Sequence, residues 1–361
     1  MTLMTLILGL LTPAIAYAII TGLHVIIPVK KTVGYVISET TGKTTTYRLN
    51  GRYVLVASIA VWFLLGWTGL VPYTWLYDTR LPGLIGACVI GLAYSFYIVG
   101  RYPSTGKPVL ADFWFGRAQD PQLKDGLIDS KVWFYMIGAV MLQLNVLSCA
   151  AYHVINAASI NYGFLLACAM LTWFCFDYLI FEKVHLWTYD YIAERVGFKL
   201  GFGCLAFYPY FYAVALWFTA ALPNPGHSGL FTILCGALYL FGWVFTRGAN
   251  MQKYFFKVTP DKKFLWIEPF ALADDEHQLL ANGYWGVTRH INYFGEIVQA
   301  VAVALAVGYF GMWMVWLYPL YYIGLLFSRQ ADDDKVCRAK YGDLWDDYTK
   351  SVKRKVIPFI Y

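Results

Sequence analysis

The stretch LILGLLTPAIAYAIITGLHVIIPV, residues 6–29, decides the class of fold. It carries no charge before Lys30 and is longer than the roughly 20 residues that a helix needs to cross a bilayer. It lacks the basic start of a signal peptide and is too long for the apolar part of one. We interpret it as the first membrane-spanning helix.

Further apolar runs follow it along most of the chain. The 361 residues are 59% hydrophobic and 14% charged, whereas soluble domains are about 25% charged. A block at 297–327 has glycines at its middle, which fits a hairpin of two helices. The sequence therefore predicts an all-α polytopic membrane protein with about nine to ten transmembrane helices. The other expected spans are 53–72, 81–100, 132–157, 161–182, 200–222 and 229–246.

Basic residues alternate between the loops. Loops 30–52, 101–131 and 183–199 are rich in Lys and Arg, and the intervening loops hold few charges. The positive-inside rule places the basic loops and most of the chain after Arg247 in the cytoplasm. We expect a multi-pass protein in the endoplasmic reticulum of a eukaryote or the inner membrane of a bacterium. The net charge of +6 follows from this sidedness and indicates the lipid bilayer, not a nucleic acid, as partner.

The seven cysteines predict neither a disulfide framework nor a metal site. No C-x-x-C motif occurs, and no His/Cys cluster has zinc spacing. Most of these cysteines lie singly in apolar segments, where free Cys behaves as a small hydrophobic residue.

Polar chemistry is concentrated near the C-terminus, in NGYWGVTRHINYFGE (282–296) and in the tail from Ser328. Cationic side chains can bind phosphate, aromatic rings can stack on a base, and amide or carboxylate oxygens can accept from hydroxyls. These properties together suit a nucleotide cofactor. The alternative is that the cations follow the positive-inside rule and pair with nearby aspartates or headgroups. The residues concerned are Lys253, Lys257, Arg289, Trp285, Tyr293, Tyr341, Asn292 and Asp333.

Standard nucleotide motifs are absent from the sequence. There is no P-loop, and the glycines of GFKLGFGC (197–204) open a membrane helix without the preceding strand that a Rossmann fingerprint requires. A cofactor must therefore bind on a helical membrane fold.

The motif at 283–296 and the tail resemble the sterol reductase family, which contains delta-14- and delta-7-sterol reductases and the membrane domain of the lamin B receptor. NMQKYFF (250–256) and ADFWFGR (111–117) are similar to further family segments. The resemblance implies NADPH-dependent reduction of a ring double bond in a sterol. The segments DDDKVCRAKYG and NYFGEI look slightly more like those of delta-7 enzymes.

The resemblance also implies a division of one integral membrane domain, 1–361. Residues 1–246 would form the sterol side and 247–361 the NADPH-binding part, where Arg289 and His290 share the motif and are expected to line the pocket. The family's cofactor-contacting positions correspond here to Lys253, Lys257, Leu280, Trp285, Asn292, Tyr293, Asp333, Cys337 and Tyr341.

Several residues depart from the family pattern. Lys257 stands where the family usually has Arg, which weakens a bidentate phosphate clamp. Cys204 replaces an Asp and Phe207 a Trp, on a helix that we expect to face the sterol. Together with Tyr212, these two residues are the expected substrate contacts, and the departures affect the substrate more than the cofactor.

The reaction requires a buried acid, because an unactivated alkene accepts a hydride poorly unless it is protonated first. Ionisable residues within a membrane segment are candidates for function, and burial keeps a carboxyl protonated. Asp177 and Glu182 lie near the end of the fifth span, with Tyr178 beside them. The alternative for each carboxylate is a structural ion pair.

Two rival functions stay open at this stage. A membrane methyltransferase that uses S-adenosylmethionine also carries an Arg-His-x-x-Tyr-x-Gly segment, but it predicts a Pro where this chain has Ile291, and paired Glu in the tail. A non-catalytic sterol-binding membrane protein is the second rival.

Overall fold

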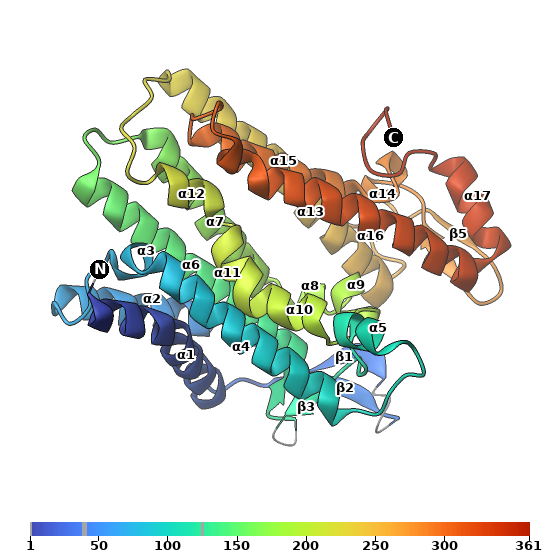
Figure 1. The fold of residues 1–361 in the computed structure, drawn as a ribbon. Coiled ribbons are helices and arrows are strands. Elements are labelled where there is room, and N and C mark those ends of the chain that lie inside the picture. The colour runs from blue at the N-terminus through green and yellow to red at the C-terminus, as the bar shows by residue number, and fades with distance from the viewer. Residues whose placement is uncertain (1, 38–41, 124–125) are drawn as a thin grey trace. The chain divides into compact units, whose positions relative to one another are not determined.

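The computed structural model describes residues 2–37, 42–123 and 126–361, and most of them are helical (Figure 1). The chain divides into two compact units, Met1–Pro225 (unit 1) and Gly226–Tyr361 (unit 2). Among the described residues, six helices are long and apolar enough to cross a membrane, and two shorter helices are apolar. The predicted class, a helical polytopic membrane protein, is confirmed.

Unit 1 contains five of the long apolar segments and one shorter helix, and their positions follow the predicted spans closely. The sixth span is broken into consecutive turns over Phe198–Thr219. The helices are α1 (Leu3–Ile26), α2 (Gly51–Trp67), α3 (Trp75–Asp78), α4 (Arg80–Arg101), α5 (Val109–Phe115), α6 (Ser130–Asn156), α7 (Tyr162–Ile180), α8 (Glu182–His185), α9 (Tyr189–Ile192), α10 (Phe198–Phe202), η1 (Gly203–Phe207), α11 (Tyr208–Phe211) and α12 (Val214–Thr219).

Polar side chains set the ends of these helices. Asp129 and Asn161 accept hydrogen bonds from the first free N–H groups of α6 and α7. At the other end of α1, Arg48 and Asn50 donate to the carbonyls of the last turn, which would otherwise lack partners. The spans therefore end where local polar residues satisfy the backbone.

Two β-hairpins, which the sequence did not predict, lie in the polar segments of unit 1. Strands β1 (Lys31–Ile37) and β2 (Thr44–Arg48) are antiparallel, as are β3 (Gln122–Leu123) and β4 (Ile128–Asp129). Tyr47 of β2 is buried with Val132, Leu186 and Tyr191. The hairpin is thus held by packing against distant segments, which a local pattern cannot reveal.

Unit 2 is built on two helices that cross closely, α13 (Gly229–Val258) and α15 (Ile291–Ala306). A Cβ on Gly242 would lie 2.7 Å from the Gly295 carbonyl oxygen, and one on Gly295 2.5 Å from that of Gly242. Only glycine permits this approach. The remaining elements are β5 (Ala271–Ala273), β6 (Gln278–Leu280), α14 (Tyr284–Val287), η2 (Trp313–Trp316), α16 (Leu317–Tyr341) and α17 (Asp343–Ser351).

Helix α13 extends well past the predicted end of its span at residue 246. Its last turns carry Gln252, Lys253 and Lys257, which the sequence analysis had left outside any span. The predicted hairpin at 297–327 corresponds to parts of α15 and α16 joined through η2, and α16 continues to Tyr341. Unit 2 therefore places the polar motif and the tail on long helices.

Candidate functional site

Gln252 of α13 holds the start of the 282–296 motif. Its Oε1 accepts from the Tyr284 N–H at 2.9 Å, and its side chain, 2% exposed, lies against Gly283. Gly283 has a φ of +62°, and a Cβ there would lie 2.2 Å from Gln252 Nε2. Only a glycine fits at this position. The segments 250–256 and 282–296, which both resemble the sterol reductases, thus contact each other here.

Lys253 lies over the ring of Trp285, with its Nζ 5.3 Å from the ring centroid. The indole N–H donates to the Ala249 carbonyl at 2.9 Å, and the Trp285 carbonyl accepts from the Tyr348 hydroxyl at 3.3 Å. The indole is therefore held through its N–H, and the backbone of Trp285 through its carbonyl. A cation and an aromatic face lie together, as an anionic nucleotide requires.

The first turn of α15 presents Asn292 and Tyr293. Asn292 Nδ2 lies 3.4 Å from Asn250 Oδ1, and its buried Oδ1 has no hydrogen-bond partner among the described residues. Tyr293 donates to Asp333 Oδ2 at 2.7 Å. The unpartnered amide oxygen can accept a hydrogen bond from a ligand.

His290 lies between two aspartates of α16. Its Nδ1 is 3.7 Å from Asp333 Oδ2, and its Nε2 is 3.8 Å from Asp334 Oδ1. Burial raises the pKa of Asp333 despite the charge of His290 and the hydrogen bond from Tyr293. Burial also raises the pKa of Asp334, but the neighbouring His290 ring and the charge of Arg289 lower it more, leaving it below its usual value.

Arg289 is directed at the C-terminal tail. Its guanidinium donates to the carbonyls of Val352 at 2.9 Å and Lys353 at 3.3 Å, and lies 3.5 Å from Asp334 Oδ2. The side chain is buried. These contacts hold the tail against the motif, while the buried Nε has no hydrogen-bond partner among the described residues. The phosphate binding expected from the sequence stays a prediction.

Three lysines supply the cationic character of unit 2. Lys257 lies within electrostatic range of Lys253 and Lys340, and none of the three forms an ion pair within the described part of the chain. Asp333 offsets part of the charge of Lys253, but clustered cations that form no ion pair still repel one another and attract an anion. The sequence analysis missed Lys340, although it directly precedes the predicted Tyr341.

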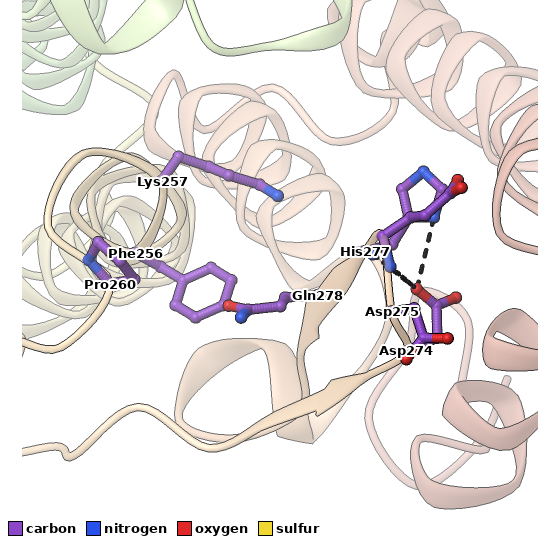
Figure 2. A pocket seen from close by; sticks show the side chains of 8 residues that line it. Phe256, Lys257, Pro260, Asp274, Asp275, His277 and Gln278 are labelled. Atoms are coloured by element: carbon purple, nitrogen blue, oxygen red, sulfur yellow. Dashed lines mark hydrogen bonds and ion pairs between the residues drawn. The ribbon is translucent and has the colours of Figure 1, made fainter.

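A pocket of about 310 Å³ lies beside Lys257. Figure 2 shows Lys257 and Phe256 on the α13 side and Asp274, Asp275 and His277 on the β5–β6 side. The Asp274 carboxylate accepts from the N–H groups of Glu276 and His277, which shapes the turn of this hairpin. The pocket therefore lies between Lys257, one of the three lysines, and the acidic turn of the β5–β6 hairpin.

The remaining predicted cofactor residues surround this region. Leu280 ends β6 and is buried. Cys337 and Tyr341 of α16 pack against a buried cluster of Ala281, Trp345, Tyr348 and Val352, and His277 lies edge-on to Tyr341 at 5.1 Å. Every predicted cofactor residue thus lies within unit 2.

The predicted acids lie in unit 1. Helix α7 ends at Ile180, so Asp177 and Tyr178 lie on its last turn while Glu182 begins α8. Glu182 is 7% exposed and accepts from the Gly51 N–H, the first of α2, at 3.0 Å. Burial raises its pKa to about 8, although the Gly51 hydrogen bond and the charge of Arg52 lower it.

The Tyr178 ring stacks on His185 with centroids 4.0 Å apart. The expected sterol contacts lie further along unit 1, at an irregular part of the sixth span. Cys204 and Phe207 lie in the π-helical turn η1, and Phe207 stacks on Phe211 at 4.2 Å. The Tyr212 ring lies 4.7 Å from that of Tyr208. Single π turns are frequent at functional sites, and this one changes the register of side chains around the helix.

Comparisons with known proteins identify the family of the chain. The model of the "Ergosterol biosynthesis ERG4/ERG24 family" matches residues 11–361. A delta(14)-sterol reductase of Arabidopsis thaliana is 30% identical over 352 residues, covering 93% of this chain and 91% of the relative. One of Methylotuvimicrobium alcaliphilum is 30% identical, covering 89% and 76%, and one of Mus musculus is 33% identical, covering 87% and 77%.

These matches decide against the methyltransferase and the non-catalytic alternatives. The chain belongs to the ERG4/ERG24 family of sterol reductases, and it is an enzyme of the membrane.

Proposed function

We propose that this enzyme reduces the delta-14 double bond of a sterol with NADPH. The relatives above carry delta(14)-sterol reductase as their name, and this favours delta-14 over the delta-7 bond slightly preferred from the motifs. The observation that carries the proposal is the group of Lys253, Lys257 and Lys340, three cations that form no ion pair in the described structure, with Lys253 over the Trp285 ring.

The residues of unit 2 fit NADPH in kind. Lysines suit phosphates, the Trp285 and Tyr341 rings suit a planar base, and the unpartnered Asn292 Oδ1 suits an amide or hydroxyl donor. The Asp274 turn beside Lys257 offers further acceptors for hydroxyls. When bound, NADPH would supply the hydride. Arg289 and His290 would act by holding the tail and α16 in place.

Unit 1 would supply the proton. Glu182 is the best-supported donor, since a carboxyl with a pKa of about 8 is protonated at neutral pH and an effective general acid has a pKa near the working pH. Asp177 and Tyr178 are the next candidates, one helical turn away. Protonation at the carbon with fewer substituents leaves a tertiary cation, which aromatic rings stabilise by roughly 0.5–2 kcal/mol.

Product identification tests the proposal. The purified protein in detergent is incubated with NADPH and, separately, with an 8,14-diene, a 5,7-diene and a side-chain unsaturated sterol. We expect loss of the delta-14 bond alone, with NADPH oxidised in equal amount. Reduction of the 5,7-diene in place of the 8,14-diene would overturn the delta-14 assignment. If none of the three sterols caused NADPH to be oxidised, the reductase proposal would be overturned.

A further inference from the structure

The last residues of the chain form a closed loop. The backbone oxygen of Tyr361 accepts from the N–H groups of Lys355, Val356 and Ile357 at 2.9, 2.9 and 3.0 Å. The Tyr361 N–H donates back to the Ile357 carbonyl at 3.0 Å. Four backbone hydrogen bonds of Tyr361 thus close residues 355–361 into a loop without a regular helix or strand.

The side chain of Tyr361 attaches this loop to α16. Its ring stacks on Phe327 with centroids 5.4 Å apart and planes 24° from parallel. Its hydroxyl donates to Gln330 Oε1 at 3.3 Å and accepts from Lys355 Nζ at 3.2 Å. Gln330 is 1% exposed, so its amide is fixed within the protein.

Two connections lead from this loop to the motif. Along the backbone, the N–H groups of Arg289 and His290 donate to the carbonyls of Arg354 and Lys355 at 2.9 and 2.8 Å. Through side chains, Gln330 Nε2 donates to Asp334 Oδ2 at 2.6 Å, and Asp334 faces Arg289 and His290. Both connections start at Tyr361 and end on the same two residues.

We propose that Tyr361 is a positioning residue for the cofactor site. It fixes the backbone of Arg289 and His290, and thereby the turn that presents Asn292 and Tyr293, while its own contacts are with the tail and α16. The inference rests on the proposed function for its effect on NADPH. The arrangement itself is independent of any cofactor.

Amide hydrogen exchange tests the arrangement without cofactor. Tyr361→Ala removes the ring and hydroxyl, and Tyr361→Phe removes the hydroxyl alone. Phe359→Ala is the control, because Phe359 is 88% exposed in the same tail. We expect exchange at Arg289 and His290 to accelerate about tenfold in Tyr361→Ala and less in Tyr361→Phe, because local opening becomes easier. Unchanged exchange in Tyr361→Ala would overturn the inference.

Cofactor binding tests the consequence. We expect the KM for NADPH to rise about tenfold in Tyr361→Ala and about threefold in Tyr361→Phe, the effect of losing one hydrogen bond. The sterol KM and the kcat at saturating NADPH should stay within about twofold of the wild-type values. A general loss of structure would instead change all three quantities, and this result would contradict a positioning role.

Gln330→Leu provides a second route if Tyr361→Ala does not fold. It interrupts only the side-chain connection, and we expect it to match Tyr361→Phe in both exchange and KM for NADPH. Wild-type behaviour of Gln330→Leu would overturn the side-chain connection. Wild-type protein that binds no NADPH would refute the proposed function, while the exchange experiment would still decide the role of Tyr361.

Discussion

The two units treat buried charge differently. In unit 1 the carboxylate of Asp112 accepts from Ser104, Thr105 and Arg117, mainly from the Thr105 hydroxyl, and these bonds lower its pKa to about 2. Glu182 receives the first N–H of α2. In unit 2, the half-buried Lys253 and the exposed Lys257 form no ion pair in the described structure, although Lys253 lies within electrostatic range of Asp333, and the buried Asn292 Oδ1 has no donor.

This difference separates charges that serve the fold from charges that serve a ligand. Cations that form no ion pair, beside a buried amide oxygen without a donor, fit an anionic ligand that supplies the missing contacts. The difference agrees with our proposal that unit 2 binds the anionic cofactor and unit 1 supplies the proton.

Reversing a charge in unit 2 has the largest expected effect. Lys253→Glu places a carboxylate beside Trp285 where we propose a phosphate, and we expect NADPH affinity to fall about 100-fold, as for loss of a charged hydrogen bond. Isothermal titration calorimetry measures the affinity. Lys262→Glu, an equal change at an exposed lysine beyond α13, should bind normally. An equal loss of NADPH affinity in both variants would show that only the net charge of the protein matters, and not the position of Lys253.

The crossing of α13 and α15 is the next most sensitive feature. In Gly295→Ala the new Cβ would lie 2.4 Å from Thr246 Oγ1 and 2.5 Å from the Gly242 carbonyl oxygen. We expect destabilisation by about 1–3 kcal/mol, seen as a lower apparent Tm and weaker NADPH binding. The control is Gly324→Ala in α16, where a Cβ has open space, and it should leave the Tm equal or higher. A wild-type Tm for Gly295→Ala would show that the crossing is looser than described.

Asn292 tests the unpartnered acceptor. Asn292→Ala removes the buried Oδ1, and we expect about tenfold weaker NADPH binding, the effect of one lost hydrogen bond in a buried site. Fluorescence titration of Trp285 and its neighbours measures the binding. The apparent Tm should change little, because the contact of Asn292 with Asn250 is long, at 3.4 Å. Wild-type NADPH affinity of Asn292→Ala would show that Asn292 does not contact the cofactor.

Glu182 in unit 1 has the smallest expected effect on stability. Its pKa is raised in the folded protein, so the folded state holds a proton that the unfolded state releases above its ordinary pKa. The resulting stability is complete below pH about 4 and is lost as the pH rises through about 8. Between pH 7 and 8 we expect a loss of about 1 kcal/mol.

Melting curves across this range measure the effect in detergent. Glu182→Gln replaces the carboxyl by an amide of similar size, which does not ionise. The Tm of this variant should therefore fall less from pH 7 to pH 8 than that of the wild type. An identical fall in both proteins would assign the pH dependence to other groups.

The sequence predicted the membrane helices well because each depends on a local apolar run. It did not predict the β1–β2 hairpin, whose Tyr47 is buried against α6, α8 and α9. It also missed that α13 continues to Val258, because polar residues follow the apolar run directly. Those last turns carry Gln252 and Lys253, and their position decides the geometry of the candidate site.

The resemblance named residues but could not assign their contacts. For Arg289 the structure adds contacts of the guanidinium with the carbonyls of the tail, which the sequence did not predict. Lys340 and Tyr361 were not selected, because their contribution depends on the loop and helix contacts of the folded unit. The NADPH contacts and the proton donor stay predictions.

The most direct test measures two quantities in two variants, one from each unit. For Lys253→Glu and Glu182→Gln, NADPH affinity is measured by calorimetry and the rate of sterol reduction by a single turnover at saturating NADPH. The account predicts that Lys253→Glu loses affinity but recovers the rate at saturation, and that Glu182→Gln keeps affinity and loses the rate. Loss of the same quantity in both variants would contradict the division between cofactor binding in unit 2 and proton supply in unit 1.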